Sequence, residues 1–280
     1  MSVKEPSLKI LINYWTLWNE KNSDGSEWTL EQSIKAVSDA GFDAYTCPAD
    51  TPGLKETLHQ YDLRFGGSFA AANQDEIKAQ VLESMRIDNG PINIMLADHD
   101  TKIEEAIELT TSLMKIGKDL NLKVHLEMHR DTCTETPEKT YAIAEGVKMA
   151  TGKYPLMNLD FSHHALVKHL MPSDYCERLF ANIPLFQQSN LWHLRPFNGH
   201  HCQIPITDGA GNFSEEYEEF RPFIIQAFKH WLDGPRPDNE FWIVPELGPK
   251  SSYGLSCFPN IWQDAIVLSK DIKTIWEELI

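Results

Sequence analysis

Cysteine is scarce in this sequence, and its spacing excludes two kinds of protein. The chain has five cysteines, an odd number, and none of them form a Cys-x-x-Cys pair. Such a pattern disfavours a disulfide framework and a cysteine zinc site, and it is typical of reduced thiols in the cytoplasm. Long apolar runs are also lacking, since none approaches the roughly 20 residues that cross a membrane. The first ten residues have no apolar signal-peptide core. We therefore expect a cytoplasmic protein with no membrane partner.

Basic residues are outnumbered as well. The 280 residues include 25 lysines and arginines against 41 aspartates and glutamates, which gives a net charge of −16. Binding to a nucleic-acid backbone depends on clustered lysine and arginine side chains, so we expect no nucleic-acid partner. The same charge disfavours an anionic membrane surface.

Eight short apolar segments alternate with helix-like segments from end to end. Short apolar runs are typical of strands that are buried on both faces of a parallel sheet. Capping boxes at Thr29–Gln32 and Thr101–Glu104, and a proline after Thr136, predict the starts of three helices. The predicted strands are Leu8–Asn13, Asp43–Cys47, Leu63–Phe69, Ile92–Leu96, Val124–His129, Leu156–Phe161, Leu191–Arg195 and Trp242–Glu246.

This alternation predicts an α/β fold, a (β/α)8 TIM barrel that forms a single domain over residues 1–280. Eight strands, each followed by a helix and without a flexible linker, are the pattern of such a barrel. A doubly wound sheet is the alternative, but it usually has a glycine-rich turn after its first strand. Here the first strand runs into Asn13, Tyr14 and Trp15 without a glycine.

Four potential metal ligands stand at the ends of apolar runs: Glu127, Asp160, His193 and Glu246. The first three are spaced 33 residues apart, about the length of one strand plus one helix. The carboxyl ends of barrel strands surround the active site, so we expect the four side chains to meet there. Three carboxylates and one imidazole suit one divalent ion, Mn²⁺, Mg²⁺, Co²⁺ or Zn²⁺. Taken singly, each has a structural alternative: Asp160 as a helix cap, for example, or His193 as a core histidine.

Other polar and aromatic residues accompany this group. Residues two apart on a strand share a face, which places His129 beside Glu127 and Arg195 beside His193. His163 follows Asp160 by one turn. We predict that His129, His163 and Arg195 bind substrate, with the alternative that the two histidines orient the metal ligands. Arg195 suits a carboxylate or phosphate oxygen, with a structural ion pair as the alternative for it and for Arg130. Trp15, together with Tyr14 and Phe69, is predicted to form an apolar wall for a substrate ring, or else to pack in the core.

The stretches HLEMHR, LDFSHH, HLR and PELGP resemble the xylose isomerase-like (β/α)8 barrels, which include sugar isomerases, sugar epimerases and type IV apurinic endonucleases. Their combination is most similar to a branch known only as sugar phosphate isomerase/epimerase. The resemblance implies that Glu127, Asp160, His193 and Glu246 bind one divalent metal. It also implies that Glu127 and Glu246 transfer protons, and it places Gln203 against the substrate. The endonucleases need an Asp-x-His pair where this chain has HLRPF, so DNA repair is not expected.

We therefore expect a metal-dependent isomerase or epimerase of a sugar, keto-sugar or related polyol. It would remove a proton next to a carbonyl and form an enediolate stabilised by the metal. Two alternatives remain: a metal-dependent dehydratase or β-eliminating lyase on a keto-sugar or inosose, and a non-catalytic sugar-binding barrel. A phosphorylated substrate is disfavoured because the Gly248–Tyr253 loop lacks a glycine-rich nest. The apolar last helix is expected to pack on the barrel, and a homo-oligomer is possible.

Overall fold

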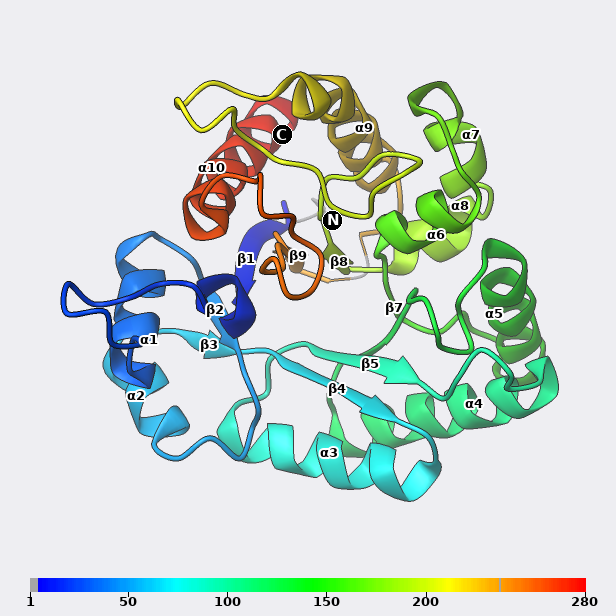
Figure 1. Ribbon diagram of the computed structural model, residues 1–280. Coiled ribbons are helices and arrows are strands. Elements are labelled where there is room, and N and C mark those ends of the chain that lie inside the picture. Colours follow the sequence, from blue (N-terminus) through cyan, green and yellow to red (C-terminus); the bar gives the residue numbers. More distant parts are fainter. Residues whose placement is uncertain (1–4, 237) are drawn as a thin grey trace.

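Nine parallel strands form one sheet that curves into a barrel (Figure 1). The computed structural model describes residues 5–236 and 238–280. The strands within this part are short, as the apolar runs predicted. They are β1 (Ser7–Asn13), β2 (Ala44–Thr46), β3 (Arg64–Phe65), β4 (Gly67–Ala71), β5 (Ile92–Leu96), β6 (Val124–Glu127), β7 (Met157–Asn158), β8 (Leu191–His193) and β9 (Glu240–Val244).

The ninth strand arises because the predicted strand Leu63–Phe69 is divided at Gly66. The hydrogen-bonded order runs β3-β2-β1-β9-β8-β7-β6-β5-β4, so β3 and β4 are the two ends of the sheet. Only Gly66 separates them along the chain, and one interrupted strand therefore closes the barrel. A Cβ at Gly66 would lie 2.0 Å from Leu11 Cδ1, which explains why the division falls at a glycine. The predicted (β/α)8 fold is confirmed.

Helices surround the sheet and lie between successive strands (Figure 1). The predicted capping box of Thr29 and Gln32 is present, and Thr136 caps a helix that begins at Pro137. The capping box predicted at Thr101 is wrong, because the helix starts at Ile103 and the Thr101 hydroxyl bonds to Asp98 instead. The helical segments are η1 (Tyr14–Leu17), α1 (Leu30–Asp39), α2 (Leu54–Gln60), α3 (Gln74–Ile87), α4 (Ile103–Leu120), α5 (Pro137–Thr151), α6 (Phe161–Val167), η2 (Pro172–Asp174), α7 (Tyr175–Leu179), α8 (Ile183–Gln188), α9 (Glu215–Leu232) and α10 (Ile261–Leu279).

Two layers of packing hold the barrel and define the position of the polar residues. Outward-facing Trp192 and Phe241 contact each other at 4.6 Å between ring centroids, and Phe241 stacks on Trp231 of α9 and Trp276 of α10. The last helix thus packs on the barrel, as expected. A smaller cluster fills the inside of the barrel: Leu11, Ala44, Leu191, Trp242 and Val244. Because side chains alternate along a strand, His193 lies one inward position beyond Leu191, above this apolar floor.

Several strands end earlier than the sequence predicted, and two of these corrections concern candidate ligands. The strand β7 ends at Asn158, and Asp160 is the N-cap of α6, where its carboxylate accepts a hydrogen bond from the Ser162 amide. The strand β9 ends at Val244, so Glu246 lies in the loop that follows. Pro245 cannot donate a ladder hydrogen bond, which is consistent with the strand ending before it.

Candidate metal centre

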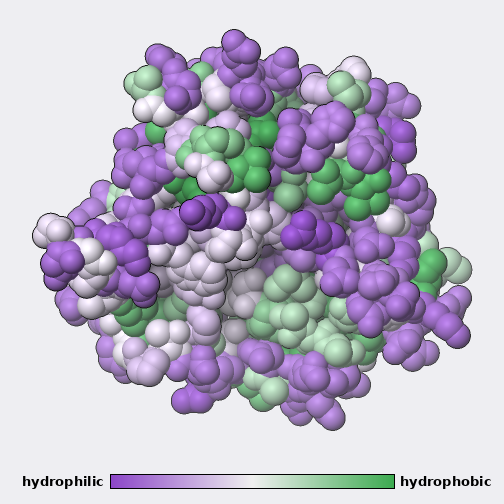
Figure 2. All heavy atoms as spheres, in the orientation of Figure 1, coloured by the Kyte–Doolittle hydropathy of each residue, from purple (hydrophilic) through white to green (hydrophobic). Residues whose placement is uncertain are grey.

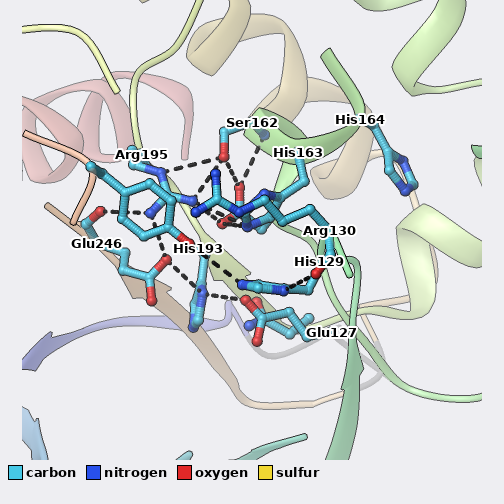
Figure 3. A network of polar contacts seen from close by, with 12 residues as sticks. Glu127, His129, Arg130, Ser162, His163, His164, His193, Arg195 and Glu246 are labelled. Carbon is cyan, nitrogen blue, oxygen red and sulfur yellow. Dashed lines mark hydrogen bonds and ion pairs between the residues drawn. The ribbon is translucent and has the colours of Figure 1, made fainter. Parts of the chain in front are cut away.

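The four predicted ligands converge at the carboxyl ends of four consecutive strands (Figure 3). Ligand atoms of Glu127, Asp160, His193 and Glu246 all lie within 4.8 Å of one another, and all four residues are buried. Glu127 ends β6 and His193 ends β8, while Asp160 and Glu246 follow β7 and β9. The barrel thus brings together residues from widely separated parts of the sequence.

Each of the three carboxylates has one oxygen fixed by a neighbour on the outside of the group. Asn93 on β5 donates to Glu127 Oε2 at 2.5 Å, and Asn13 at the end of β1 donates to Glu246 Oε1 at 3.1 Å. The Ser162 amide and hydroxyl both donate to Asp160 Oδ1, at 3.0 and 2.5 Å. The second oxygen of each carboxylate therefore faces inward. Such outer hydrogen bonds orient metal ligands and are characteristic of metal centres.

His193 supplies the nitrogen at the middle of the group. Its Nδ1 lies 3.0 Å from Glu127 Oε1 and 3.2 Å from Glu246 Oε2. Nevertheless this buried atom makes no well-directed hydrogen bond to any residue that the structure describes. Burial alone would lower the pKa of His193, but the two glutamates raise that pKa well above its ordinary value. A nitrogen that faces two carboxylate oxygens without bonding to either suits coordination of a shared cation.

The size and charge of the group also fit one divalent ion. Ligands at about 2.1 Å from an ion stand at most about 4.2 Å apart, so the group would contract by only a few tenths of an ångström. A metal ligand must be deprotonated, so His193 is neutral when an ion is bound. The three carboxylates and the Arg195 guanidinium then carry a formal charge of −2, which one divalent ion offsets. Without a metal ion, burial raises the pKa of Glu127, but the positive charge of His193 lowers that pKa by more. The pKa of Glu127 is therefore below its ordinary value, and Glu127 is ionised at neutral pH.

Arg195 lies behind the ligands. It is fully buried, and it donates to Asp160 Oδ2 at 2.6 Å and to Glu246 Oε2 at 3.0 Å. It also contacts the Ser162 hydroxyl, at 2.9 Å. We predicted that Arg195 binds substrate, with an ion pair as the alternative. The ion pair is what the structure contains, and Arg195 orients two of the candidate ligands.

His129 and His163 lie beside the group, with their ring centroids 4.2 Å apart. Together with Glu127 they form a second set of closely spaced donors. His163 Nε2 is 3.3 Å from Arg195 Nη2 and 3.4 Å from Asp160 Oδ2. Burial and the Arg195 charge lower the pKa of His163 well below its ordinary value, so its imidazole is neutral. Cationic groups around this second set disfavour a further metal ion there.

A cavity of about 660 Å³ opens over the candidate metal centre. Glu127, His129, Glu246 and Tyr253 line its polar end. Figure 2 shows a hollow near the middle of this face, with pale and green residues on its walls and hydrophilic residues around it. The walls away from the ligands include Tyr14, Trp15, Phe65, Phe69 and Met95. Trp15, predicted to contact substrate, thus lies in the cavity wall and meets Tyr253 edge to face at 5.7 Å between ring centroids.

Gln203, the remaining predicted substrate contact, is buried beneath two loops. Its Oε1 accepts from the Gly248 amide at 2.7 Å, and its Nε2 donates to the Gly248 carbonyl at 3.2 Å. Both ends of the amide are therefore engaged by the loop that follows Glu246. The placement gives Gln203 a role in fixing that loop.

Several residues of the site were not predicted from sequence. Asn13, Asn93, Ser162 and Tyr253 all contact a candidate ligand or a residue beside one. Asn93 could have been found from the sequence, because a single amide side chain inside the apolar run Ile92–Leu96 is unusual for a buried strand. Tyr253 lies in an irregular loop, where no periodicity indicates its direction.

Comparisons with known proteins support the fold. No protein-family model and no curated protein sequence matches the chain. A D-allulose 3-epimerase structure from Methylomonas sp., in complex with D-allulose, aligns at a TM-score of 0.57 and 14% identity, covering 98% of this chain and 97% of that one. A xylose isomerase-like TIM barrel protein from Mycobacterium smegmatis, in complex with magnesium, aligns at 0.58 and 14%, covering 97% and 98%. The probable 3-DHS dehydratase AsbF from Bacillus anthracis aligns at 0.56 and 15%, covering 93% and 98%.

Among residues 5–236 and 238–280, no helix has both the length and the apolar character needed to span a bilayer.

At 14 to 15% identity the structural likeness concerns the fold, and it extends over nearly the whole chain. The chain therefore has the fold of the xylose isomerase-like TIM barrel proteins.

Proposed function

We propose that the protein is a metal-dependent isomerase or epimerase of a sugar, keto-sugar or related polyol. The observation that carries this proposal is the arrangement of Glu127, Asp160 and Glu246, each with one oxygen fixed from outside and the other turned inward to His193 and Arg195. In the proposal these three carboxylates and His193 hold one divalent ion, Mn²⁺, Mg²⁺, Co²⁺ or Zn²⁺.

The proposed chemistry is proton transfer at a carbon next to a carbonyl. A divalent ion in this site would draw electron density from the substrate's carbonyl and hydroxyl oxygens and so offset the negative charge that proton removal creates. Glu127 and Glu246 both face the cavity, where one removes the proton and the other returns it. Arg195 and Asn93 hold these carboxylates in place, and the aromatic wall around Trp15 excludes water from part of the cavity.

A dehydratase or β-eliminating lyase acting on a keto-sugar or inosose is the second candidate. Its first step is the same proton removal, and one protein of the same fold is a probable dehydratase. A sugar-binding barrel without catalysis is less favoured, because three buried carboxylates facing one another are costly to keep without a cation. The mass of the product would distinguish the two catalytic candidates, and a lack of any turnover would indicate the sugar-binding barrel.

The test is turnover of a ketose and inosose panel in D₂O with each of the four metals. Proton removal incorporates deuterium next to the carbonyl, isomerisation conserves the remaining mass, and dehydration loses water. We expect about one metal ion per chain, and we expect Glu246→Gln to reduce turnover by 100-fold or more. Glu240→Gln, at the first residue of β9, is the control. Full turnover by the folded Glu246→Gln variant, or deuterium incorporation that survives complete removal of metal, would refute the assignment.

A further inference from the structure

Arg130 follows β6 by three residues, in a turn that buried groups hold firmly. The Glu127 carbonyl accepts from the Thr134 hydroxyl at 2.5 Å, and the Thr132 hydroxyl donates to the His129 carbonyl at 2.7 Å. Asp131 has a φ of 60°, a left-handed conformation that a non-glycine residue adopts rarely. Such a conformation persists only where the surrounding structure enforces it. The turn is therefore preorganised, and it places Arg130 next to His129, which lines the cavity.

The Arg130 guanidinium lies over the Tyr253 ring, with its carbon 4.8 Å from the ring centroid. The guanidinium carbon of Arg195 lies 4.0 Å from the same centroid. The two guanidinium groups therefore lie near each other, on one tyrosine ring. They differ in exposure, because Arg195 is buried and Arg130 is exposed. Figure 3 draws the two arginines on opposite sides of one cluster. Tyr253 lines the cavity together with Glu127 and Glu246, so Arg130 lies against a residue of the cavity wall.

The two arginines differ in their partners. Both charged ends of Arg195 are paired with carboxylates. The Arg130 guanidinium, in contrast, forms no ion pair and no hydrogen bond with any residue that the structure describes. Besides the candidate ligands, the acidic residues that line the cavity are Glu83, which is paired with Arg86, and Asp50, and neither is paired with Arg130. The hydrogen-bond donors of Arg130 are thus available to a ligand.

The balance of charges around the site favours an anionic ligand for Arg130. A divalent ion would neutralise the formal charge of the three ligand carboxylates and Arg195. Arg130 then leaves one positive charge in excess beside the cavity wall at Tyr253. A chain with a net charge of −16 repels anions at long range, so an anionic ligand requires a local cation of this kind. The planar guanidinium is suited to two parallel hydrogen bonds with a carboxylate or a phosphate.

We propose that the substrate carries an anionic group, a carboxylate or a phosphate, at the end away from the reacting carbon, and that Arg130 binds this group. The inference rests on the proposed function for the location of the reacting end. It reassigns the anion contact that the sequence suggested for Arg195 to a residue three positions beyond Glu127. Arg130 is accordingly a specificity-determining residue, and its loss should affect charged substrates selectively.

The test measures binding to the metal-loaded protein by calorimetry, with hexoses of the gluco, manno and galacto series. Each series supplies a neutral hexose, its hexuronate and its 6-phosphate, so only the group at carbon 6 differs. In at least one series we expect a charged member to bind ten-fold or more tightly than the neutral one. Arg130→Gln should weaken that member by about 10- to 100-fold and leave the neutral hexose unchanged. The hexuronate and 6-phosphate arms distinguish a carboxylate from a phosphate.

Two control variants separate ligand binding from general charge effects. Arg178→Gln removes an exposed arginine on α7 and makes the same change in net charge, so it should preserve the preference for the charged sugar. Arg130→Lys retains the charge without the planar fork and should give an intermediate loss. Metal affinity, measured in parallel, should be unchanged in Arg130→Gln, because Arg130 contacts none of the candidate ligands.

Three results would overturn the inference. These are equal or tighter binding of the neutral hexose in all three series, no binding of any charged member, and an unchanged preference in Arg130→Gln. Failure of the proposed function has a different signature. If charged sugars bind through Arg130 but no deuterium is incorporated with any metal, the catalytic assignment is wrong and the anion site stands.

Discussion

Arg195 and Asp160 form a fully buried ion pair, with Nη2 of the arginine 2.6 Å from Oδ2 of the aspartate. The same guanidinium bonds to Glu246, so a single side chain holds two candidate metal ligands from different strand ends. Breaking a buried pair by removing one partner costs about 3–5 kcal/mol, because the other charge is left without compensation. Arg195 therefore contributes to stability and to the site at once.

This relationship predicts how Arg195→Met behaves. Without metal, the free energy of unfolding should fall by roughly 3–5 kcal/mol. Added Mn²⁺ should raise the free energy of unfolding of the variant by more than it raises that of the wild type, because the ion replaces the lost positive charge. Urea denaturation with and without Mn²⁺ measures both effects. Arg221→Met is the matched control, because Arg221 also bonds to a carboxylate, Asp271, through two nitrogens. Equal recovery by metal in the two variants would contradict the prediction.

Asn93 gives a second prediction, which concerns metal affinity and not stability. Its amide fixes the outer oxygen of Glu127 at 2.5 Å. Losing a partner that orients a ligand typically costs 10- to 100-fold in metal affinity. We expect Asn93→Leu to weaken Mn²⁺ binding by a factor in this range, as measured by competition with a fluorescent chelator. Asn190→Leu serves as the control, because Asn190 is equally buried in the barrel but bonds to His125 and Glu240. A similar loss of affinity in both variants would show that the effect is indirect.

The order of strands and helices follows from sequence because periodicity and apolar runs are local properties. Val124–Glu127 and Ile92–Leu96 are recognisable without any knowledge of their neighbours. The ends of strands are less predictable, since Asp160 and Glu246 belong to a helix cap and a loop whose geometry depends on tertiary contacts. Arg195 is buried and contacts carboxylates, whereas Arg130 is exposed. This difference in burial arises only when the chain has folded, so it could not be predicted from the sequence.

Gly66 supplies a third prediction, on the interrupted strand that closes the barrel. A Cβ at this position would lie 2.0 Å from Leu11 Cδ1 and 3.1 Å from Thr46 Oγ1. Gly66→Ala should therefore lower the free energy of unfolding by about 1–3 kcal/mol through overpacking. In the Leu11→Ala background the same substitution has space, so the two changes should cost less together than the sum of their separate effects. A double-mutant cycle from urea denaturation tests this. Strict additivity would mean that the two side chains do not meet.

His164 provides a prediction on pH dependence. This histidine is buried near Thr134, whose carbonyl oxygen lies 3.0 Å from its Nε2. Burial lowers the pKa of His164 to about 4, against an ordinary value of 6.5. Between these two values the unfolded chain binds a proton that the folded chain does not. The free energy of unfolding must then decrease as the pH falls from 6.5 to 4, by at most about 1.4 kcal/mol per pH unit for this residue.

The measurement compares the wild type with His164→Gln, whose amide can still donate to the Thr134 carbonyl. Urea denaturation at intervals between pH 7 and pH 4 should give a shallower pH dependence for the variant. The difference should reach roughly 3 kcal/mol at the acid end. His125 is buried as well, and burial lowers its pKa to about 4, so some acid sensitivity remains in the variant. His59→Gln, at an exposed position on α2, should follow the wild type. Parallel curves for the wild type and His164→Gln would show that His164 takes up a proton in the folded protein.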